Sequence, residues 1–240
     1  MASSRISWAL IVIVLAGCLL RLYGLDAESL WRDEISSVNV ARLELQQIIA
    51  NRAADVHPPL YYFLLHYWMV LWGSSEFAVR FLSLVFGSLS IWPMYRIGTL
   101  LFNHHVGLLS ALGLALSEFQ IKYSQEAKGY SLMGLLTVLS FVSLLQMLRR
   151  HGRFAATRYT LFTSLLMYTH AYALFVVISQ NFYYFLSARS SLAKTINVRR
   201  WLLLQGALFL VYLPWVRVLW HQISTVQEGF WFHQPTVFSL

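Results

Sequence analysis

The sequence is a series of long apolar stretches separated by short polar or basic segments. A membrane-crossing helix needs about 20 apolar residues, because each residue rises about 1.5 Å and the hydrocarbon layer is about 30 Å thick. Hydrophobic residues make up 58% of the 240 positions and charged residues only 12%, which excludes an ordinary soluble domain. The pattern predicts an all-α, polytopic transmembrane bundle with about seven crossings. The expected crossings are Trp8–Leu25, Phe77–Ile97, Val106–Ile121, Tyr130–Leu148, Tyr159–Thr169, Tyr172–Leu186 and Trp201–Trp220.

Charge and cysteine content narrow the function classes. The single cysteine, Cys18, excludes an internal disulfide and a cysteine-based zinc site. The net charge of +8 comes from Lys and Arg clusters between apolar runs, so no nucleic acid partner is expected. Leu15-Ala16-Gly17-Cys18 is similar to a lipoprotein cleavage box, but the apolar run continues past it, which favours an uncleaved first span.

The basic clusters predict which loops lie on the same side of the membrane. Short loops rich in Lys and Arg stay cytoplasmic. Two such clusters follow the fourth and sixth expected spans, so the segment 26–59, the turn "YSQEAKGY" and the turn at His170 are expected together on the outer side. Leu60–Trp72 must then be a shallow or re-entrant helix, because residues 60–97 can make only one net crossing. The two clusters are Arg149, Arg150, Arg153 and Arg158, and Arg189, Lys194, Arg199 and Arg200.

The external segment 26–59 contains the acidic sequence "WRDE". Apolar residues recur at helical spacing from Ile35 to Ile49, which predicts an amphipathic helix on the membrane surface. Asp33 and Glu34 precede it. They are either carboxylates that stabilise the start of the helix, or they include a general base whose site is shaped by Trp31 and Arg32.

Further ionisable residues are expected on the same outer side. His57 precedes two prolines that fix the entry to the next apolar run, and it is either structural or a ligand. Glu126 and Lys128 lie two residues apart between two spans, which favours a site over a simple salt bridge within a helix. His170 is either a buried, hydrogen-bonded histidine or a contact to metal or phosphate.

One other charged pair has a structural interpretation. Glu76 and Arg80 are four residues apart, which predicts an ion pair on one helix. The remaining acid, imidazole and ammonium groups predict an outward-facing pocket beside the lipid. Such a pocket suits a phosphorylated sugar carried on a lipid, because a cation can bind the phosphate and a carboxylate can activate a hydroxyl.

The ordered motifs also resemble a known family. "WRDE", "HPPLYYFLLHYW", "GSSEFAVRFLSLVFG", "YSQEAKGYSL" and "YTHAYALF" are together similar to the GT-C superfamily of glycosyltransferases that use polyprenyl-phosphate sugars. Within it, the chain resembles bacterial membrane proteins of the dolichyl-phosphate-mannose-protein mannosyltransferase type, which are related to lipid A aminoarabinose transferase. The resemblance covers most of residues 8–235.

The resemblance implies an inverting transfer in which Asp33 of the Asp33–Glu34 pair is the base. Substrate contacts are expected from Arg32, His57, Tyr61, Glu126, Lys128 and His170, with Lys128 standing where relatives commonly carry arginine. The metal-binding glutamate of aminoarabinose transferase is replaced here by Val56, so no metal site carries over and a divalent ion remains an open question.

The sequence thus predicts one transmembrane domain over residues 1–240, the N-terminal portion of a longer protein, in a bacterial inner membrane with an external active face. The expected partners are a polyprenyl-phosphate-sugar donor, membrane lipid, and a lipid, glycan or protein acceptor, with no nucleotide cofactor. Two alternatives remain: a transporter or flippase for a phospholipid or lipid-linked sugar, and an inactive remnant. Crowding of the charges at one face rather than at the midplane favours the enzyme over the transporter.

Overall fold

The computed structural model describes residues 2–55, 57–149, 153–189 and 197–229. The regular elements in these ranges are all helices, which confirms the predicted all-α class. They are α1 (Ala2–Leu22), α2 (Arg32–Ala41), α3 (Leu45–Ala53), α4 (Leu60–Trp72), α5 (Glu76–Leu89), α6 (Ile91–Leu101), α7 (His104–Leu116), α8 (Glu118–Ser124), α9 (Tyr130–Arg149), α10 (Arg153–Met167), α11 (Ala173–Arg189) and α12 (Val198–Gly229).

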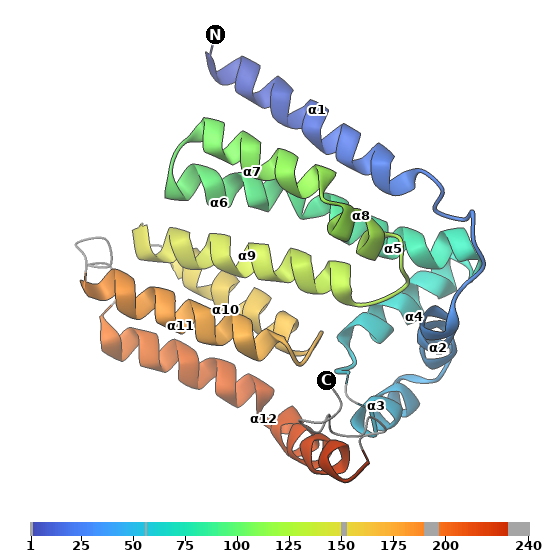
Figure 1. Cartoon of the computed structure of the whole chain (residues 1–240). Helices are drawn as coiled ribbons and strands as arrows, with labels where there is room; N and C mark the ends of the chain where they lie inside the picture. Colours follow the sequence, from blue (N-terminus) through green and yellow to red (C-terminus); the bar gives the residue numbers. More distant parts are fainter. Residues whose placement is uncertain (1, 56, 150–152, 190–196, 230–240) are drawn as a thin grey trace, which may run out of the picture.

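Most of the helices run back and forth along one direction (Figure 1). At the right of the view lie residues 23–55 and 57–59, the turn 125–129 and the turn 168–172, which we call the acidic-loop end. The turn between α6 and α7 and the start of α12 lie at the opposite end. The three segments that sequence analysis expected on one side of the membrane therefore share one end of the bundle.

Helix length and hydropathy identify some of the crossings. Glu76–Leu101, Tyr130–Arg149 and Val198–Gln222 are long and apolar enough to span a membrane, and Trp8–Leu22, His104–Leu116 and Ala173–Ser187 are shorter apolar helices. The chain is therefore a membrane protein with several apolar helices. The count of about seven crossings stays a prediction.

Two expected helices are broken by local capping. The prediction of one continuous surface helix over residues 35–49 is wrong, because α2 ends before Arg42 and α3 begins after Glu44. The N–H of Glu44 donates to Gln47 Oε1 at 3.3 Å at the start of α3. The predicted span 106–121 is also two helices, since Ser117 leaves helical geometry and its hydroxyl accepts from the N–H of Gln120 at 3.4 Å. A side chain that caps a new helix competes locally with continuation of the old one.

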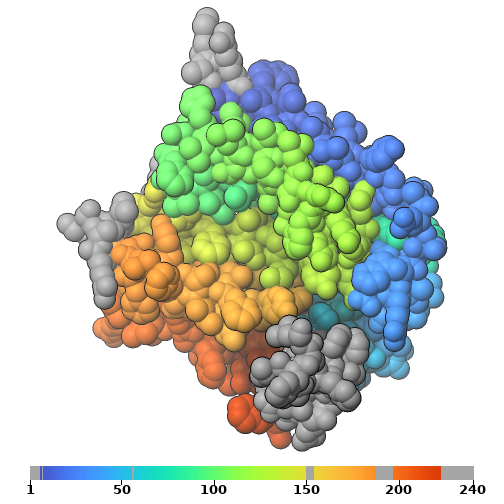
Figure 2. Space-filling view, in the orientation of Figure 1, coloured from blue at the N-terminus to red at the C-terminus, as the bar shows by residue number. Residues whose placement is uncertain are grey.

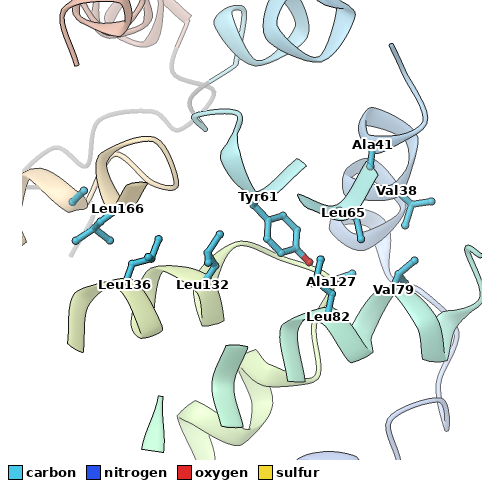
Figure 3. Close-up of a cluster of buried hydrophobic side chains, with 11 residues drawn as sticks. Val38, Ala41, Tyr61, Leu65, Val79, Leu82, Ala127, Leu132, Leu136 and Leu166 are labelled. Carbon is cyan, nitrogen blue, oxygen red and sulfur yellow. The ribbon is translucent and has the colours of Figure 1, made fainter. Parts of the chain in front are cut away.

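The segment 60–72 is a helix that stays at the acidic-loop end, beside α2 and α5 (Figure 1). Its inner face contributes Tyr61 and Leu65 to a buried apolar cluster. Figure 3 shows Tyr61 with its hydroxyl pointing toward Leu82 and Ala127. The cluster joins α2, α4, α5, α9, α10, the start of α11 and the turn 125–129, so its burial holds the acidic loop onto the bundle.

The remaining helices stack in order across the molecule. In the space-filling view, α1, then α7 and α8, then α9 to α11, and then α12 follow one another down the visible face (Figure 2). Close approach of α6 and α7 depends on glycine, because a Cβ on Gly98 would lie 2.8 Å from the Cα of Gly107. A Cβ on Gly87 of α5 would lie 2.0 Å from Ser124 Oγ of α8. Glycines thus let α6 pack closely on α7 and α5 pack closely on α8.

Candidate functional site

A buried ion pair anchors the acidic loop to the bundle. Glu34, in the first turn of α2, is fully buried, and its carboxylate accepts two hydrogen bonds from Arg80 of α5, at 2.9 Å from Nε and 2.7 Å from Nη2. The geometry is bidentate, which is the strongest arrangement for an arginine and a carboxylate. Sequence analysis paired Arg80 with Glu76, and this was wrong, because Glu76 is exposed and Arg80 turns inward to Glu34.

Arg80 also fixes the backbone before the acidic motif. Its Nη1 donates to the carbonyls of Leu25 and Glu28, at 3.0 and 2.7 Å, and its Nη2 donates to the carbonyl of Ser29 at 3.2 Å. One guanidinium therefore satisfies three carbonyls and one carboxylate. Because every one of these partners belongs to the segment 25–34, the path of the chain into α2 depends on Arg80.

The same carboxylate reaches the motif "YSQEAKGY". Glu34 Oε1 accepts from the N–H of Ala127 at 2.9 Å, so the turn 125–129 is tied to α2. This contact brings Lys128 close to Asp33, with Lys128 Nζ 3.6 Å from Asp33 Oδ2. Lys128 is largely buried and Asp33 is about half exposed, at 12% and 47% of their side-chain surfaces. Asp33 can thus meet a substrate from solvent while its partner lies deeper.

Tyr61 supports Lys128 from the core side. Its hydroxyl and that of Ser83 are 3.0 Å apart, and Ser83 Oγ donates to the carbonyl of Lys128 at 3.2 Å. Tyr61 is 1% exposed, so its hydroxyl is used inside the protein while its ring forms a wall of the site. The path from Tyr61 to Lys128 runs through α5 and fixes the backbone at the lysine.

Lys128, Tyr61 and two histidines line one small pocket. The rings of His57 and His170 meet edge to face with their centroids 5.3 Å apart, and Tyr130 lies 5.8 Å from His170. The pocket is small: about 10 Å³ is available to the centre of a water molecule, so about one water molecule fits. A phosphate or sugar therefore requires these side chains to separate on binding. The lining residues are His57, Tyr61, Tyr62, Lys128, Gly129, Tyr130, Thr169 and His170.

His170 is held as a neutral hydrogen-bond donor. Burial, and then the neighbouring His57 and Lys128, lower the pKa of His170 to about 4. Its Nδ1 accepts from the N–H of Tyr172 at 3.1 Å, so the proton of the neutral ring is on Nε2. A neutral imidazole can donate to a phosphate or sugar oxygen without adding charge to the pocket.

Glu126 lies in the same turn but is not part of the pocket wall. Burial raises its pKa, and the charges of Glu34 and Asp33 act in the same direction, while Lys122 and Lys128 oppose the shift. The carboxyl is thus easier to protonate than an ordinary glutamate. The prediction that Glu126 contacts Lys128 or a sugar stays a prediction.

Arg32 faces a different part of the surface. It lines a groove of about 460 Å³ between α2 and α3 with Asn39 and Asn51, and no ion pair of Arg32 occurs within the described part of the chain. Arg52 closes the other side of this groove through hydrogen bonds to Asn51 and Asp55. Asp33 lines neither this polar groove nor the histidine pocket, but it lies next to Arg32 in the sequence and 3.6 Å from Lys128 of the pocket.

No group of three His, Cys, Asp or Glu side chains in the described ranges is placed to share a metal ion. His57 Nδ1 lies 3.9 Å from Asp55 Oδ2. The imidazole of His170 is the other potential metal ligand near His57, with the two ring centroids 5.3 Å apart.

Sequence reasoning missed several residues that build the site. Arg80 was recognised as charged but assigned the wrong partner. Ser83 carried no signal, because a serine within an apolar run does not indicate which distant group its hydroxyl bonds. Arg21 is fully buried, and its guanidinium bonds Ser124 Oγ and the carbonyls of Leu114 and Ala115, thereby fixing the helix before the turn 125–129. An arginine inside an apolar run is itself a signal of an internal partner, although the sequence does not say which.

The comparisons with known proteins agree with the resemblance in the motifs. The model of the dolichyl-phosphate-mannose-protein mannosyltransferase family matches residues 56–220, which begins after the acidic motif and includes the turn 125–129 and His170. No curated protein and no solved structure matches the chain. Since the match covers more than half of the residues, the chain belongs to the dolichyl-phosphate-mannose-protein mannosyltransferase family, a GT-C type of glycosyltransferase.

Proposed function

We propose that the protein transfers a sugar from a polyprenyl-phosphate donor to an acceptor hydroxyl, with inversion, at the acidic-loop end of the bundle. Family membership and the apolar helices support a membrane glycosyltransferase that uses a lipid-linked donor. The observation that carries the finer proposal is the Asp33–Lys128 pair, with Nζ and Oδ2 3.6 Å apart at the rim of the histidine pocket.

The reaction uses opposite charges on the two sides of the anomeric carbon. Asp33 accepts the proton of the acceptor hydroxyl as the oxygen attacks that carbon. The bond between the carbon and the phosphate oxygen breaks, and the electron pair leaves with the polyprenyl phosphate. Lys128 and the Nε2–H of His170 stabilise the charge that develops on the phosphate. Binding requires Lys128 to turn from Asp33 toward the phosphate, which leaves Asp33 as a free base.

The other candidate residues have supporting roles in this proposal. Glu34 is a positioning residue, because its carboxylate is used by Arg80 and Ala127 and is closed to solvent. His57 and Tyr61 shape the phosphate pocket, and Glu126 orients the sugar or Lys128. Arg32 lies on the acceptor side of Asp33. The acidic-loop end faces the outside of the cell.

The proposal is tested with the full chain in detergent and a polyprenyl-phosphate [¹⁴C]mannose donor, with cell membranes as the source of acceptor. Release of polyprenyl phosphate and labelling of the acceptor are measured together. We expect D33N to lower the rate by about 10²-fold or more, the usual contribution of a general base. D26N is the matched control, because Asp26 is an exposed carboxylate of the same loop. With the same chain reconstituted in lipid vesicles, movement of intact donor between leaflets without its cleavage would contradict the enzyme and support a flippase.

A further inference from the structure

The groove between α2 and α3, which we call the α2–α3 groove, is a roomy polar space near the candidate base. Its volume of about 460 Å³ is within the usual range of roughly 300–1,000 Å³ for ligand sites. The histidine pocket, by contrast, has room for about one water molecule. A second substrate therefore finds space in the α2–α3 groove that the pocket does not offer.

The lining of the groove combines polar edges with an apolar surface. Arg32, Ser36 and Asn39 stand at the three- and four-residue spacing of one helix face, and all three are exposed. Asn51 of α3 is a further exposed amide of the lining, while Val40 is a buried apolar residue of it. A sugar ring has the matching character, because its hydroxyls project from the rim of the ring and its C–H groups form apolar faces.

The charge of the groove favours an anionic ligand. The described lining contains two arginines and no carboxylate. Arg52 is already used inside the protein, since its Nη1 donates to Asp55 Oδ2 at 2.5 Å and to the Tyr62 hydroxyl at 3.0 Å. Arg32 is exposed and makes no ion pair with the described residues. Its guanidinium is therefore available to bind a carboxylate or a phosphate through two parallel hydrogen bonds.

A ligand in this groove can reach the candidate base. Ser36 follows Asp33 by three residues on α2, and side chains at that spacing are neighbours, with about 5–6 Å between their Cβ atoms. A sugar that contacts Ser36 and Arg32 can therefore place one further hydroxyl at Asp33.

An extended peptide fits the groove less well than a sugar does. Peptides that bind as an added strand need a free strand edge, and α2 and α3 use their backbone groups within the helices. The lining thus offers side chains, which suit the hydroxyls of a sugar.

We infer that the α2–α3 groove binds a sugar unit of the acceptor, and that this sugar carries a carboxylate or phosphate group bound by Arg32. This inference rests on the proposed function, because it makes the ligand of the groove the acceptor. The ring lies on the apolar lining at Val40, and its hydroxyls meet Asn39 and Asn51. Another hydroxyl of the same glycan is left at Asp33. The acceptor is accordingly an acidic glycan.

The test compares ligands that share one ring and differ in its charge. The full chain in detergent is titrated at low ionic strength with D-glucose, D-glucuronate and D-glucose 6-phosphate, and Kd is measured from the nuclear magnetic resonance signals of the sugar. We expect at least one anionic sugar to bind about tenfold more tightly than glucose, the gain from a charge-assisted hydrogen bond. The tighter of the two identifies the anionic group.

Two variants separate the charge from the hydroxyls. R32Q should remove the preference for the anionic sugar and leave the Kd of glucose near wild type. N39A should weaken all three sugars by a similar factor, because Asn39 meets hydroxyls that the three share. R42Q is the matched control, since Arg42 is an exposed cation of the same loop that bonds Ser74 Oγ at 3.3 Å and does not line the groove.

Several results would overturn the inference. Equal Kd values for the three sugars would do so, as would equal losses in R32Q and R42Q. Inorganic phosphate that binds as tightly as glucose 6-phosphate would show that the groove recognises an anion and no sugar. Tighter binding of the tripeptide aspartyl-seryl-aspartate than of either anionic sugar would make the acceptor a protein.

The transfer assay keeps this failure distinct from failure of the proposed function. The anionic sugar should inhibit labelling of the membranes in competition with the acceptor and not with the donor, and R32Q should leave KM for the donor unchanged. Cleavage of the donor without any sugar preference would overturn the inference alone. Absence of donor cleavage by wild type would contradict the proposed function itself.

Discussion

At the scale of single residues, two adjacent carboxylates have opposite environments. Asp33 is about half exposed beside Lys128, while Glu34 is fully buried between Arg80 and the N–H of Ala127. The difference follows from the helical turn, because consecutive side chains on a helix point about 100° apart. One carboxylate can therefore react while its neighbour fixes the loop that presents it.

Removal of Arg80 should strongly destabilise the protein. R80A leaves the Glu34 carboxylate buried without its cation and frees three loop carbonyls, so we expect a loss of roughly 3–5 kcal/mol in the free energy of unfolding. Thermal unfolding in detergent measures the effect. E76Q is the control, since Glu76 is exposed one turn before Arg80 on the same helix. Equal melting temperatures for R80A and wild type would contradict the buried pair.

His170 should make stability depend on pH. Its pKa falls from the usual value near 6.5 to about 4 in the folded protein. Between these values the unfolded state binds more protons, so the contribution of His170 to stability is complete above pH 6.5 and is lost as the pH falls toward 4. Glu126, whose pKa is raised, opposes part of this loss. We expect the melting temperature of H170N to fall less than that of wild type between pH 7 and pH 4.5.

His105 provides the comparison for that experiment, because it is exposed at the start of α7. H105N should keep the wild-type slope of melting temperature against pH. If the melting temperatures of H170N and H105N change equally with pH, His170 is not the group that is held neutral by burial.

At the scale of helices, close packing between neighbouring helices depends on positions without a Cβ. Gly98 and Gly107 allow α6 and α7 to touch, and Gly87 allows α5 to approach α8 at Ser124. Ser124 in turn accepts from Arg21 of α1 at 3.2 Å. Small residues at helix contacts are typical of membrane bundles, where close backbone approach replaces the hydrophobic drive between helices.

An alanine at Gly107 should therefore be costly. Its Cβ would lie 2.5 Å from Thr99 Oγ1 and 2.8 Å from the carbonyl oxygen of Tyr95, so we expect G107A to lower the free energy of unfolding by about 1–3 kcal/mol. G113A is the control on the same helix, because nothing lies within 4 Å of a Cβ there. The better helix propensity of alanine should make G113A neutral or more stable by up to about 1 kcal/mol. Melting temperatures in detergent compare the two variants.

At the scale of the whole molecule, the candidate site is assembled from segments far apart in the sequence. The acidic motif, the turn 125–129 and the turn 168–172 meet because the intervening helices return to the same end of the bundle (Figure 1). A bundle that crosses a membrane places that end on one side of it. The basic clusters of the sequence predict that the acidic-loop end is outside.

Single-cysteine labelling tests this orientation. Cys18 is replaced by serine, and cysteines are placed one at a time at Ser36, Lys122 and Tyr172 of the acidic-loop end and at Asn103 and His105 of the opposite end. All five positions are exposed. In intact cells an impermeant thiol reagent should label the three positions of the acidic-loop end. It should label the two positions of the opposite end only after permeabilisation. The reverse pattern would put the site in the cytoplasm, and a mixed pattern within one end would contradict the bundle.

Sequence alone determined the helical class, the membrane environment, the family, and the grouping of the three polar segments at one end. Hydropathy and basic clusters act locally and additively along the chain, so they can be read without coordinates. The motifs also identified Asp33, Lys128, His57 and His170, which lie together at the acidic-loop end. Ser117 and Glu44, which cap new helices, were visible in the sequence, but whether such residues break a helix depends on the packing around them.

Only the tertiary structure decided which charged residues are partners. Glu76 stands one turn from Arg80, yet Arg80 bonds Glu34, 46 residues away in sequence. The four-residue spacing favours an exposed ion pair that contributes a few tenths of a kcal/mol. Because Arg80 is buried, its guanidinium N–H groups must instead find acceptors inside the protein. The pairing of Lys128 with Asp33 likewise arises from how the helices pack, because no periodicity within a helix specifies its contacts with another.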